Sequence, residues 1–329
     1  MKRILSGITP SSTSGLHLGN YLGAVKRFVE FQREHECFFF VANLHALNTV
    51  HDPKVAQENS RNIFLEYLAF GIDPTKTTFY IESDIPEITY LQTILNNCVT
   101  VAEMQRMHGY KDKMAKEADQ GTINVGLFNY PILMAADIML FDADIVPVGE
   151  DQSQHVEVCR EIGRTFNNRY GSILKIPELS IQRETARVIG TDGVRKMSKS
   201  LGNDLPVFAD EKHIYKQIMG ITTDPARIKP TDAGDPAKNI GFSYLRLLDH
   251  PEAEVSTLEA RYRSGTVGDV EIKKLIYEVF MTYMKPFRTR KVELESDPST
   301  IDRLREQGAQ RARVIATASL ARIREAVGV

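Results

Sequence analysis

The sequence predicts an α/β fold, in which a doubly wound parallel sheet is followed by a helical domain. Short apolar runs alternate with longer stretches of helical periodicity through the N-terminal two thirds of the chain. The runs are apolar throughout, as in strands that are covered on both faces of a parallel sheet. Beyond Asp204 only helical patterns follow. We therefore expect a Rossmann-like domain over residues 1–205 and a helical domain over residues 206–329.

The first element pattern is strand, turn, helix. Arg3–Ile8 is short and largely apolar, and Thr9–Gly15 consists of Thr, Pro, Ser and Gly residues. His17 and Asn20 then open a helix whose apolar face is formed by Tyr21, Leu22, Val25, Phe28 and Val29. A helix start directly after a strand offers N–H groups to a phosphate, although an ordinary capped helix with an exposed histidine gives the same pattern.

The middle of the sheet domain repeats this alternation. Strands are predicted at Cys37–Ala42 and Thr77–Glu82, and helices at Pro53–Phe70, Pro131–Phe141 and Glu150–Tyr170. Ligands of such sheets bind at the carboxyl ends of strands. Thr9-Pro10 and Gly149–Gln152 both follow predicted strands directly, so we expect the ligand crevice between them.

The C-terminal region is predicted to be helical and slightly basic. Helices are expected at Glu211–Met219, Phe242–Leu248, Glu254–Arg263, Asp269–Glu295 and Thr300–Val327. From Arg261 to Val329 there are 14 Lys and Arg against 9 Asp and Glu. This excess fits a partner that carries phosphates, but a solvated helical surface explains it equally well. Within this region, Arg288, Arg290 and Lys291 are interpreted as a solvated face, with a nucleic-acid backbone contact as the alternative.

Length and composition restrict the class of protein without identifying it. The chain has 329 residues and a formal net charge of −2, so the whole molecule does not attract nucleic acid in general. It contains no apolar run near the roughly 20 residues that span a bilayer, and residues 1–20 lack a signal-peptide core, which predicts a cytoplasmic protein. Cys37, Cys98 and Cys159 are widely spaced, which favours reduced core thiols over disulfides or a zinc site.

A second motif lies at Lys196-Met197-Ser198-Lys199-Ser200, bounded by Gly193 and Gly202. Arg195 adds a third positive charge, and no acid occurs between Gly193 and Asn203. Two ammonium groups on a glycine-bounded loop are typical of an anion site, and a polyphosphate fits them. Lysine- and serine-rich surface loops are also common without any ligand.

Together the two motifs resemble the signatures of the class I aminoacyl-tRNA synthetases, a His-x-Gly-His-like helix start and a Lys-Met-Ser-Lys-Ser loop. Here the first reads His17-Leu18-Gly19-Asn20, and Asn in its fourth place is similar to the tryptophanyl branch. Further stretches support that branch: Tyr130–Asp137, Val146–Gln152 and Gln154-His155. The resemblance spans the whole chain. It departs at Thr9, where many relatives have Gln, and at Asn43-Leu44-His45, which replaces Asp-Gln-His.

The resemblance implies a two-step reaction in which tryptophan and ATP form an aminoacyl-adenylate and the aminoacyl group then passes to tRNA(Trp). It assigns Lys196 and Lys199 to the pyrophosphate and His17 to the phosphate chain, and these three are the expected catalytic residues. The wider ATP site comprises Thr9, Pro10, Ser11, His17, Gly19, Asn20, Gly149, Glu150, Asp151, Ile189, Lys196, Met197, Ser198, Lys199 and Ser200. Mg²⁺ is expected on the nucleotide, and no protein-held metal is predicted.

Asp137 is the residue expected to choose the amino acid. On the predicted helix it shares a face with Tyr130, Met134 and Phe141, so its carboxylate is expected to be buried. A buried carboxylate needs a donor, and the indole N–H of a substrate would supply one. An internal Arg, Lys or backbone N–H is the alternative donor. The expected tryptophan site comprises Asp137, Met134, Tyr130, Gln152, His45 and Gly7.

The resemblance also implies a homodimer joined through the sheet domain, and the stretch Ile88–Met107 is apolar enough to take part. Alternative functions are a tyrosine-specific relative, a small-molecule nucleotidyltransferase, and a non-catalytic or secondary paralogue that binds tryptophan or tRNA. The intact lysine pair disfavours the paralogue, and the helical C-terminal region disfavours the small nucleotidyltransferase.

Overall fold

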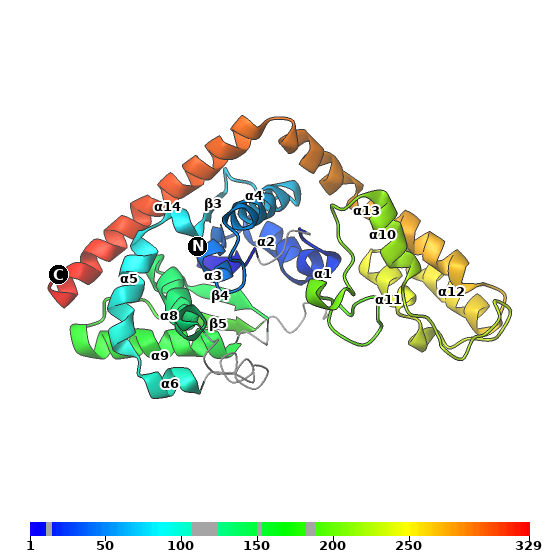
Figure 1. Ribbon diagram of the computed structural model, residues 1–329, viewed down its shortest axis with the longest axis horizontal. Helices are drawn as coiled ribbons and strands as arrows, with labels where there is room; N and C mark the ends of the chain where they lie inside the picture. The colour runs from blue at the N-terminus through cyan, green and yellow to red at the C-terminus, as the bar shows by residue number, and fades with distance from the viewer. Residues whose placement is uncertain (11–14, 107–123, 150–152, 182–187) are drawn as a thin grey trace.

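The computed structural model describes residues 1–10, 15–106, 124–149, 153–181 and 188–329 (Figure 1). Within this part of the chain, five parallel strands form one sheet in the order β3-β2-β1-β4-β5. The strands are β1 (Arg3–Ile8), β2 (Glu36–Val41), β3 (Thr77–Ile81), β4 (Ile145–Val148) and β5 (Glu178–Ile181). The predicted α/β class with a doubly wound parallel sheet is confirmed.

The described helices include those predicted from the sequence, but the helix predicted at Pro131–Phe141 begins at Val125 and contains Pro131, and the helices within residues 87–105 were not predicted. They are α1 (Leu18–Asn20), the π-helix η1 (Tyr21–Val25), α2 (Lys26–Phe31), α3 (Asn43–Ala46), α4 (Pro53–Ala69), the 3₁₀ turn η2 (Glu82–Asp84), α5 (Glu87–Leu95), η3 (Asn96–Cys98), α6 (Val101–Gln105), α8 (Val125–Leu140), α9 (Ser153–Tyr170), η6 (Lys199–Leu201), α10 (Glu211–Met219), η7 (Pro236–Lys238), α11 (Ile240–Leu247), α12 (Glu252–Arg263), α13 (Asp269–Glu295) and α14 (Pro298–Val327). α4 is capped by the Asp52 carboxylate, which accepts from the Lys54 and Val55 N–H groups.

Successive side chains of each strand point to opposite faces of the sheet, and helices cover both faces. Ile4 and Phe39 belong to one core cluster, which includes side chains of α2 and α4. Leu5, Phe38 and Phe40 belong to the other, which includes side chains of α5, α8 and α9. Continuous apolar strands are therefore needed, as their sequences predicted. Cys37, Cys98 and Cys159 are all buried and none is in a disulfide, so their expected place in the core is confirmed.

The order of the strands places the ligand crevice. From β1 the chain adds β2 and β3 on one side and then β4 and β5 on the other side. Between β1 and β4 the direction of winding therefore reverses, and a cleft is expected outside their carboxyl ends, at Ile8 and Val148.

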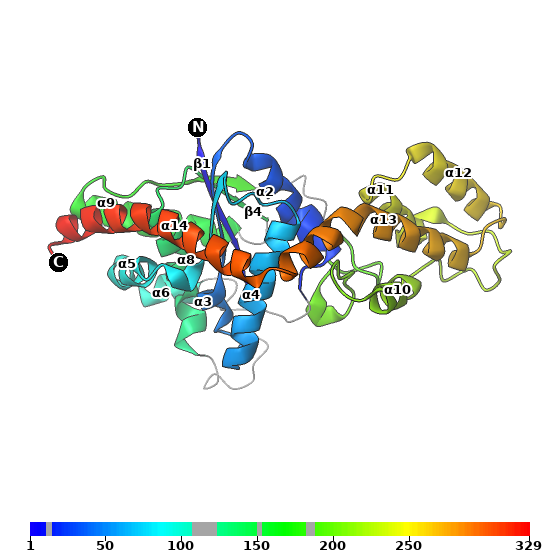
Figure 2. The same ribbon diagram turned by 90° about the horizontal axis from the view of Figure 1, so that it is seen from above.

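The C-terminal helices divide into two groups (Figure 1). Figure 1 shows α10, α11, α12 and the start of α13 at one end of the molecule, away from the strands, and α13 then runs back to pack against α4. α14 runs back and packs against β3, α5 and α8, as both ribbon views show (Figure 2). At Gly308 this helix approaches the Phe79 carbonyl so closely that a Cβ has no room. The division at residues 205 and 206 stays a prediction.

The structure shows the contacts of Arg288 and Lys291, two residues of the predicted solvated face. The Arg288 guanidinium donates to the carbonyls of Val207 (2.6 Å) and Ala209 (2.9 Å), and Lys291 pairs with Glu295 at 2.9 Å. The interpretation of Arg288 as part of a solvated face was therefore wrong, because this side chain fastens α13 to the segment that follows the lysine loop.

Among the described helices, none combines the length and the apolar character that crossing a membrane requires.

Candidate active site

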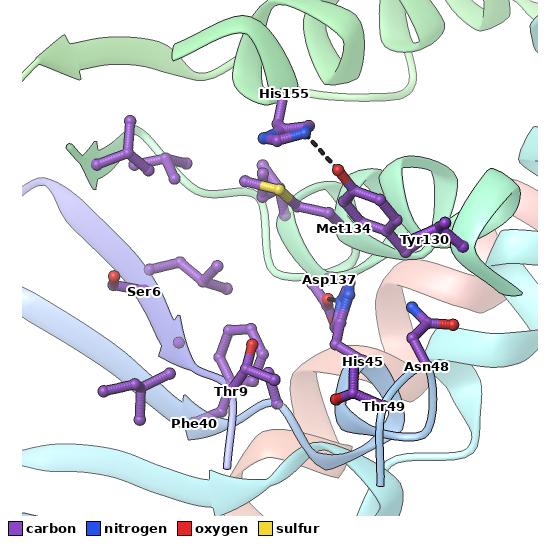
Figure 3. A pocket seen from close by; sticks show the side chains of 18 residues that line it. Ser6, Thr9, Phe40, His45, Asn48, Thr49, Tyr130, Met134, Asp137 and His155 are labelled. Carbon is purple, nitrogen blue, oxygen red and sulfur yellow. Dashed lines mark hydrogen bonds and ion pairs between the residues drawn. The ribbon is translucent and has the colours of Figure 1, made fainter. Parts of the chain in front are cut away.

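A cleft of about 520 Å³ lies at the carboxyl ends of β1, β2 and β4, where the topology predicts a ligand site (Figure 3). It brings together five residues that were expected around the amino acid, and also Thr9. Its lining is formed by Leu5, Ser6, Gly7, Ile8, Thr9, Phe40, Ala42, His45, Asn48, Thr49, Leu127, Tyr130, Met134, Asp137, Ile138, Val146, Val148 and His155. The sixth expected residue, Gln152, lies outside the described residues.

Asp137 is buried in α8 as expected, with 1% of its surface exposed. Its Oδ2 lies 3.0 Å from Nε2 of His45, which belongs to α3. Its Oδ1 is buried and has no hydrogen-bond partner among the residues that the structure describes. The internal donor is thus an imidazole, a group not considered from the sequence, and it satisfies one of the two carboxylate oxygens.

Glu82 completes a buried cluster with Asp137 and His45. It is the first residue after β3 and is fully buried, and its Oε1 lies 3.6 Å from His45 Nε2. Burial and the nearby Asp137 raise the pKa of Glu82 to about 8. Burial also raises the pKa of Asp137 well above its usual value and lowers that of His45. The cluster therefore resists carrying several charges at once.

The same three residues form the one group, in the described part of the chain, that could hold a metal ion. One ligand atom from each lies within 4.8 Å of the others. The sequence did not indicate this set, because Glu82 is far from both partners along the chain. Two carboxylates and an imidazole suit a divalent cation, but a substrate N–H suits the same carboxylate oxygens.

The opposite wall of the cleft is held by a second histidine. The Tyr130 hydroxyl lies 2.6 Å from Nε2 of His155, which is buried near the start of α9 (Figure 3). Met134 is half-buried and lies one helical turn from both Tyr130 and Asp137. α8 and α9 therefore orient the aromatic and thioether groups that face Asp137.

The helix start at His17 has the predicted form. The His17 N–H donates to Asn20 Oδ1 (3.1 Å), and the Asn20 N–H donates to His17 Nδ1 (3.3 Å), a reciprocal cap of α1. His17 is 8% exposed. Burial, reinforced by Lys199 and Lys196, lowers its pKa to about 4, so the ring is neutral at physiological pH.

The lysine loop is a short hairpin. Gly190 N–H donates to Arg195 O (2.8 Å) and Met197 N–H to Val188 O (2.9 Å), so the segments before and after the turn pair with each other. Gly193 at φ +71° makes the turn, and Gly202 at φ +63° ends η6. Both positions favour glycine because other residues rarely adopt these angles. Lys196 is exposed, whereas Lys199 is half-buried and burial lowers its pKa.

Arg195 does not add to the positive charge that the loop offers to a ligand. Its Nε lies 2.8 Å from Asp192 Oδ2, and Asp192 also accepts from the N–H groups of Val194 and Arg195. These bonds lower the pKa of Asp192. The expectation of three ligand-facing cations was therefore wrong for Arg195, because its partner Asp192 lies directly before the acid-free stretch that begins at Gly193.

Several contacts join the lysine loop to the helix start. Met197 is buried, and its Sδ accepts from the Gly19 N–H at 3.3 Å. After the loop, Leu18 N–H donates to Leu205 O (2.8 Å) and Val207 N–H donates to Leu16 O (3.1 Å). The two motifs, far apart along the chain, are thus neighbours in the fold.

Glu66 lies beneath this junction, on α4. It is 3% exposed, and its Oε2 accepts from the Leu16 N–H at 2.5 Å. Burial raises its pKa to about 7, although the Leu16 bond and the positive charges of Lys291 and Lys199 oppose the shift. A carboxylate in this position holds the segment that leads into His17.

The remaining expected ATP-site residues occupy different places. Pro10 is buried, and its carbonyl accepts from Asn59 Nδ2 at 3.3 Å. Gly149 lines a smaller cavity of about 170 Å³ beside β1 and β4, which Gly7 and Gly23 also line. The Ile189 carbonyl accepts from the Tyr244 hydroxyl at 2.7 Å, which ties the loop to α11. Ser11, Glu150 and Asp151 lie outside the described residues.

Comparison with known protein families decides the assignment. Residues 1–285 match the family described as tRNA synthetases class I (W and Y). The chain belongs to this family.

Full-length relatives of this class I synthetase share its length and fold. It is 43% identical over 327 residues to the tryptophan–tRNA ligase of Rhodopirellula baltica, covering 99% of each chain. It is 39% identical to the tryptophan–tRNA ligase of Treponema pallidum, covering 100% of this chain and 97% of that one. The crystal structure of tryptophanyl-tRNA synthetase from Campylobacter jejuni complexed with ADP and tryptophan superposes with a TM-score of 0.91 at 39% identity, over 99% of this chain and 100% of that one.

Sequence reasoning missed two residues that shape this synthetase's cleft. Glu82 gives only a weak local signal, because it stands at the end of a predicted apolar strand. His155 was noted only as part of the resemblance, and its contact with Tyr130 follows from the packing of α8 against α9. An acid that directly follows a buried strand was the one available hint for Glu82.

Proposed function

We propose that this class I synthetase attaches L-tryptophan to tRNA(Trp) at the expense of ATP. The tryptophan carboxylate attacks the α-phosphorus of ATP and releases diphosphate, and the 2′ hydroxyl of the terminal tRNA adenosine then takes the aminoacyl group and releases AMP. The observation that carries the proposal is the buried Asp137, with one oxygen lacking a partner among the described residues, in the cleft of a chain that closely resembles tryptophan–tRNA ligases.

The cleft lined by Asp137 takes the amino acid. Asp137 Oδ1 accepts the indole N–H, Met134 lies against the ring, and Tyr130, His45 and Gly7 form the walls. Gln152 contacts the amino group. A site built to hydrogen-bond a substrate N–H rejects analogues that lack it by a large factor, which separates tryptophan from phenylalanine.

The junction of His17 with the lysine loop takes the phosphates. Lys196 and Lys199 hold the leaving diphosphate, and neutral His17 donates to the phosphate chain. Catalysis of this kind depends on alignment and on stabilising developing charge, so the protein needs no nucleophile. Adenosine and its ribose are contacted by residues at the β1 and β4 ends and on the loop: Thr9, Pro10, Ser11, Gly19, Asn20, Gly149, Glu150, Asp151, Ile189, Met197, Ser198 and Ser200.

The remaining partners follow from this reaction. Mg²⁺ accompanies ATP as part of the substrate and neutralises phosphate charge. The enzyme acts in the cytoplasm as a homodimer, with tRNA contacting both subunits. The segment Ile88–Met107 was expected at the dimer interface; Ile88, Leu91 and Leu95 pack into the chain's own core, whereas Tyr90 and Val101 are exposed.

The test is amino-acid-dependent exchange of radiolabelled diphosphate into ATP with each of the twenty amino acids, followed by aminoacylation of tRNA(Trp). We expect exchange with tryptophan alone, and charging of this tRNA. Exchange with tyrosine instead would establish the tyrosine-specific alternative. Because the chain contains no Trp residue, substrate fluorescence reports binding directly. Tryptophan binding without any exchange would identify a non-catalytic paralogue.

A further inference from the structure

The inference concerns Glu82, and it rests on the proposed function. Glu82 stands behind His45, at the junction of η2 with α3. Its Oε2 accepts from the Leu44 N–H at 2.9 Å. Beside it, Asn43 and Ser83 exchange two hydrogen bonds of 2.8 and 3.0 Å. α3, which carries His45, is therefore fastened to the end of the neighbouring strand.

The cluster has fewer donors than acceptors. His45 Nε2 is 3.0 Å from Asp137 Oδ2 and 3.6 Å from Glu82 Oε1. A ring nitrogen carries one hydrogen, so the shorter distance assigns that hydrogen to Asp137. Asp137 Oδ1 and Glu82 Oε1 then both lack partners within the described part of the chain, and both are buried. A buried acceptor without a donor is costly, so Asp137 Oδ1, which belongs to a residue that lines the cleft, points to a ligand that brings a donor.

The charges of the cluster agree with this count. Besides His45 and Asp137, the titratable side chains that face it in the described part of the chain are Tyr80 and Cys159, both fully buried, and Tyr130, whose ring lies edge-on to that of His45. Burial raises the pKa of both carboxyls, so the cluster retains a proton.

We infer that Glu82 is a positioning residue for substrate selection. It fixes the position of α3 through the Leu44 N–H, and thereby fixes the His45 ring. The ring N–H then donates to Asp137 Oδ2. Asp137 Oδ1 is thereby left as the acceptor for the indole N–H. Glu82 itself does not contact the substrate, since it does not line the cleft.

The test compares Glu82→Ala with Glu82→Gln. Calorimetry measures the binding of tryptophan and of β-(3-benzothienyl)alanine, in which sulfur replaces the indole N–H, and diphosphate exchange gives KM and kcat. For Glu82→Ala we expect tryptophan to bind about 10- to 100-fold more weakly, with the preference over the sulfur analogue reduced by a similar factor and kcat changed by less than about threefold. Glu82→Gln keeps an acceptor for Leu44 and should bind tryptophan within about threefold of the unaltered protein.

Ser83→Ala is the matched control, because it removes the hydroxyl that accepts from Asn43 in the same junction without touching the cluster. It should leave the discrimination unchanged, even if it lowers Tm as Glu82→Ala does. In the Asp137→Ala background, Glu82→Ala should cause no further loss of discrimination, since it acts through Asp137.

Three results would overturn the inference. The first is unaltered discrimination in Glu82→Ala, and the second is an additive loss in the double variant. The third is Zn²⁺ that binds the unaltered protein at one equivalent and stays bound in saturating tryptophan, which would make the cluster a metal site. Tryptophan binding without exchange would instead refute the proposed function, and the binding comparison would still decide the role of Glu82.

Discussion

The amino-acid cleft and the lysine-loop junction differ in the burial of their polar groups and in how firmly those groups are held. Around Asp137 the polar groups are buried and held by α3, α8 and the strand ends. Around Lys199 the charges are exposed or half-buried, and a few backbone bonds and the Met197 side chain hold the loop against the helix start.

This difference teaches where selectivity and charge handling can reside. A buried acceptor discriminates strongly because an unpaired partner in low dielectric is costly, whereas a diphosphate must enter and leave. We therefore expect changes at the cleft to alter binding of the amino acid, and changes at the loop to alter the rate of adenylate formation.

The largest expected effect is that of Lys199→Ala. Removing a cation that stabilises charge on the leaving diphosphate should lower kcat for tryptophan-dependent exchange about 100- to 1000-fold. The dissociation constant of tryptophan, read from its fluorescence, should stay within about threefold. Arg195→Ala is the control, because Asp192 already pairs that charge. A large rise in the tryptophan dissociation constant of Lys199→Ala would remove the distinction between the two regions.

Asp137→Ala should show the reverse pattern with a smaller magnitude. Loss of the carboxyl acceptor for the indole N–H should weaken tryptophan binding about 10- to 100-fold and bring it close to phenylalanine. Exchange measured over a range of concentrations of each amino acid, which gives KM and kcat/KM for both, checks this. If the preference for tryptophan over phenylalanine survives, the selecting group lies elsewhere in the cleft.

Glu66→Gln sharpens the comparison, since Glu66 is a buried acid on the loop side. Its pKa in the folded protein is raised to about 7, so the folded state binds more protons than the unfolded state between about pH 4.5 and pH 7. Stability from this group is present below that window and is lost as the pH rises through about 7. Gln cannot ionise, so we expect the variant to match the unaltered protein near pH 5 and to exceed its unfolding free energy by on the order of 1–2 kcal/mol near pH 8. Urea titrations at both pH values measure this, and equal stability at the higher pH would show that folding does not raise the pKa of Glu66.

Met197→Leu should have the smallest effect. Leucine fills the buried space but cannot accept from the Gly19 N–H, so KM for ATP should rise about threefold with little change in Tm. Steady-state kinetics at saturating tryptophan provide the measurement. A change in KM for tryptophan instead would mean that the loop also shapes the amino-acid cleft.

Much of the fold could be predicted because its signals are local. The apolar runs of β1 to β3, the cap formed by His17 and Asn20, and the period of the C-terminal helices each depend on near neighbours in sequence. The burial of Asp137 followed from one helix face. These features are set by backbone geometry and side-chain spacing, which a sequence displays directly.

The rest could not be predicted because it depends on segments that meet only after folding. Glu82 reaches His45 and Asp137 because β2 and β3 end side by side. Arg288 reads as a surface residue of a helix, yet it binds carbonyls of the chain after the lysine loop. Such pairings are set by tertiary packing, which overrides local preference.

The return of α14 to the sheet has a consequence for biosynthesis. β3 is an edge strand, and the helix that covers it is encoded more than two hundred residues later. At ribosomal speed that interval lasts roughly 10–50 s. A nascent polypeptide therefore displays an unprotected strand edge for most of its translation, and during that time this edge is open to pairing with other chains.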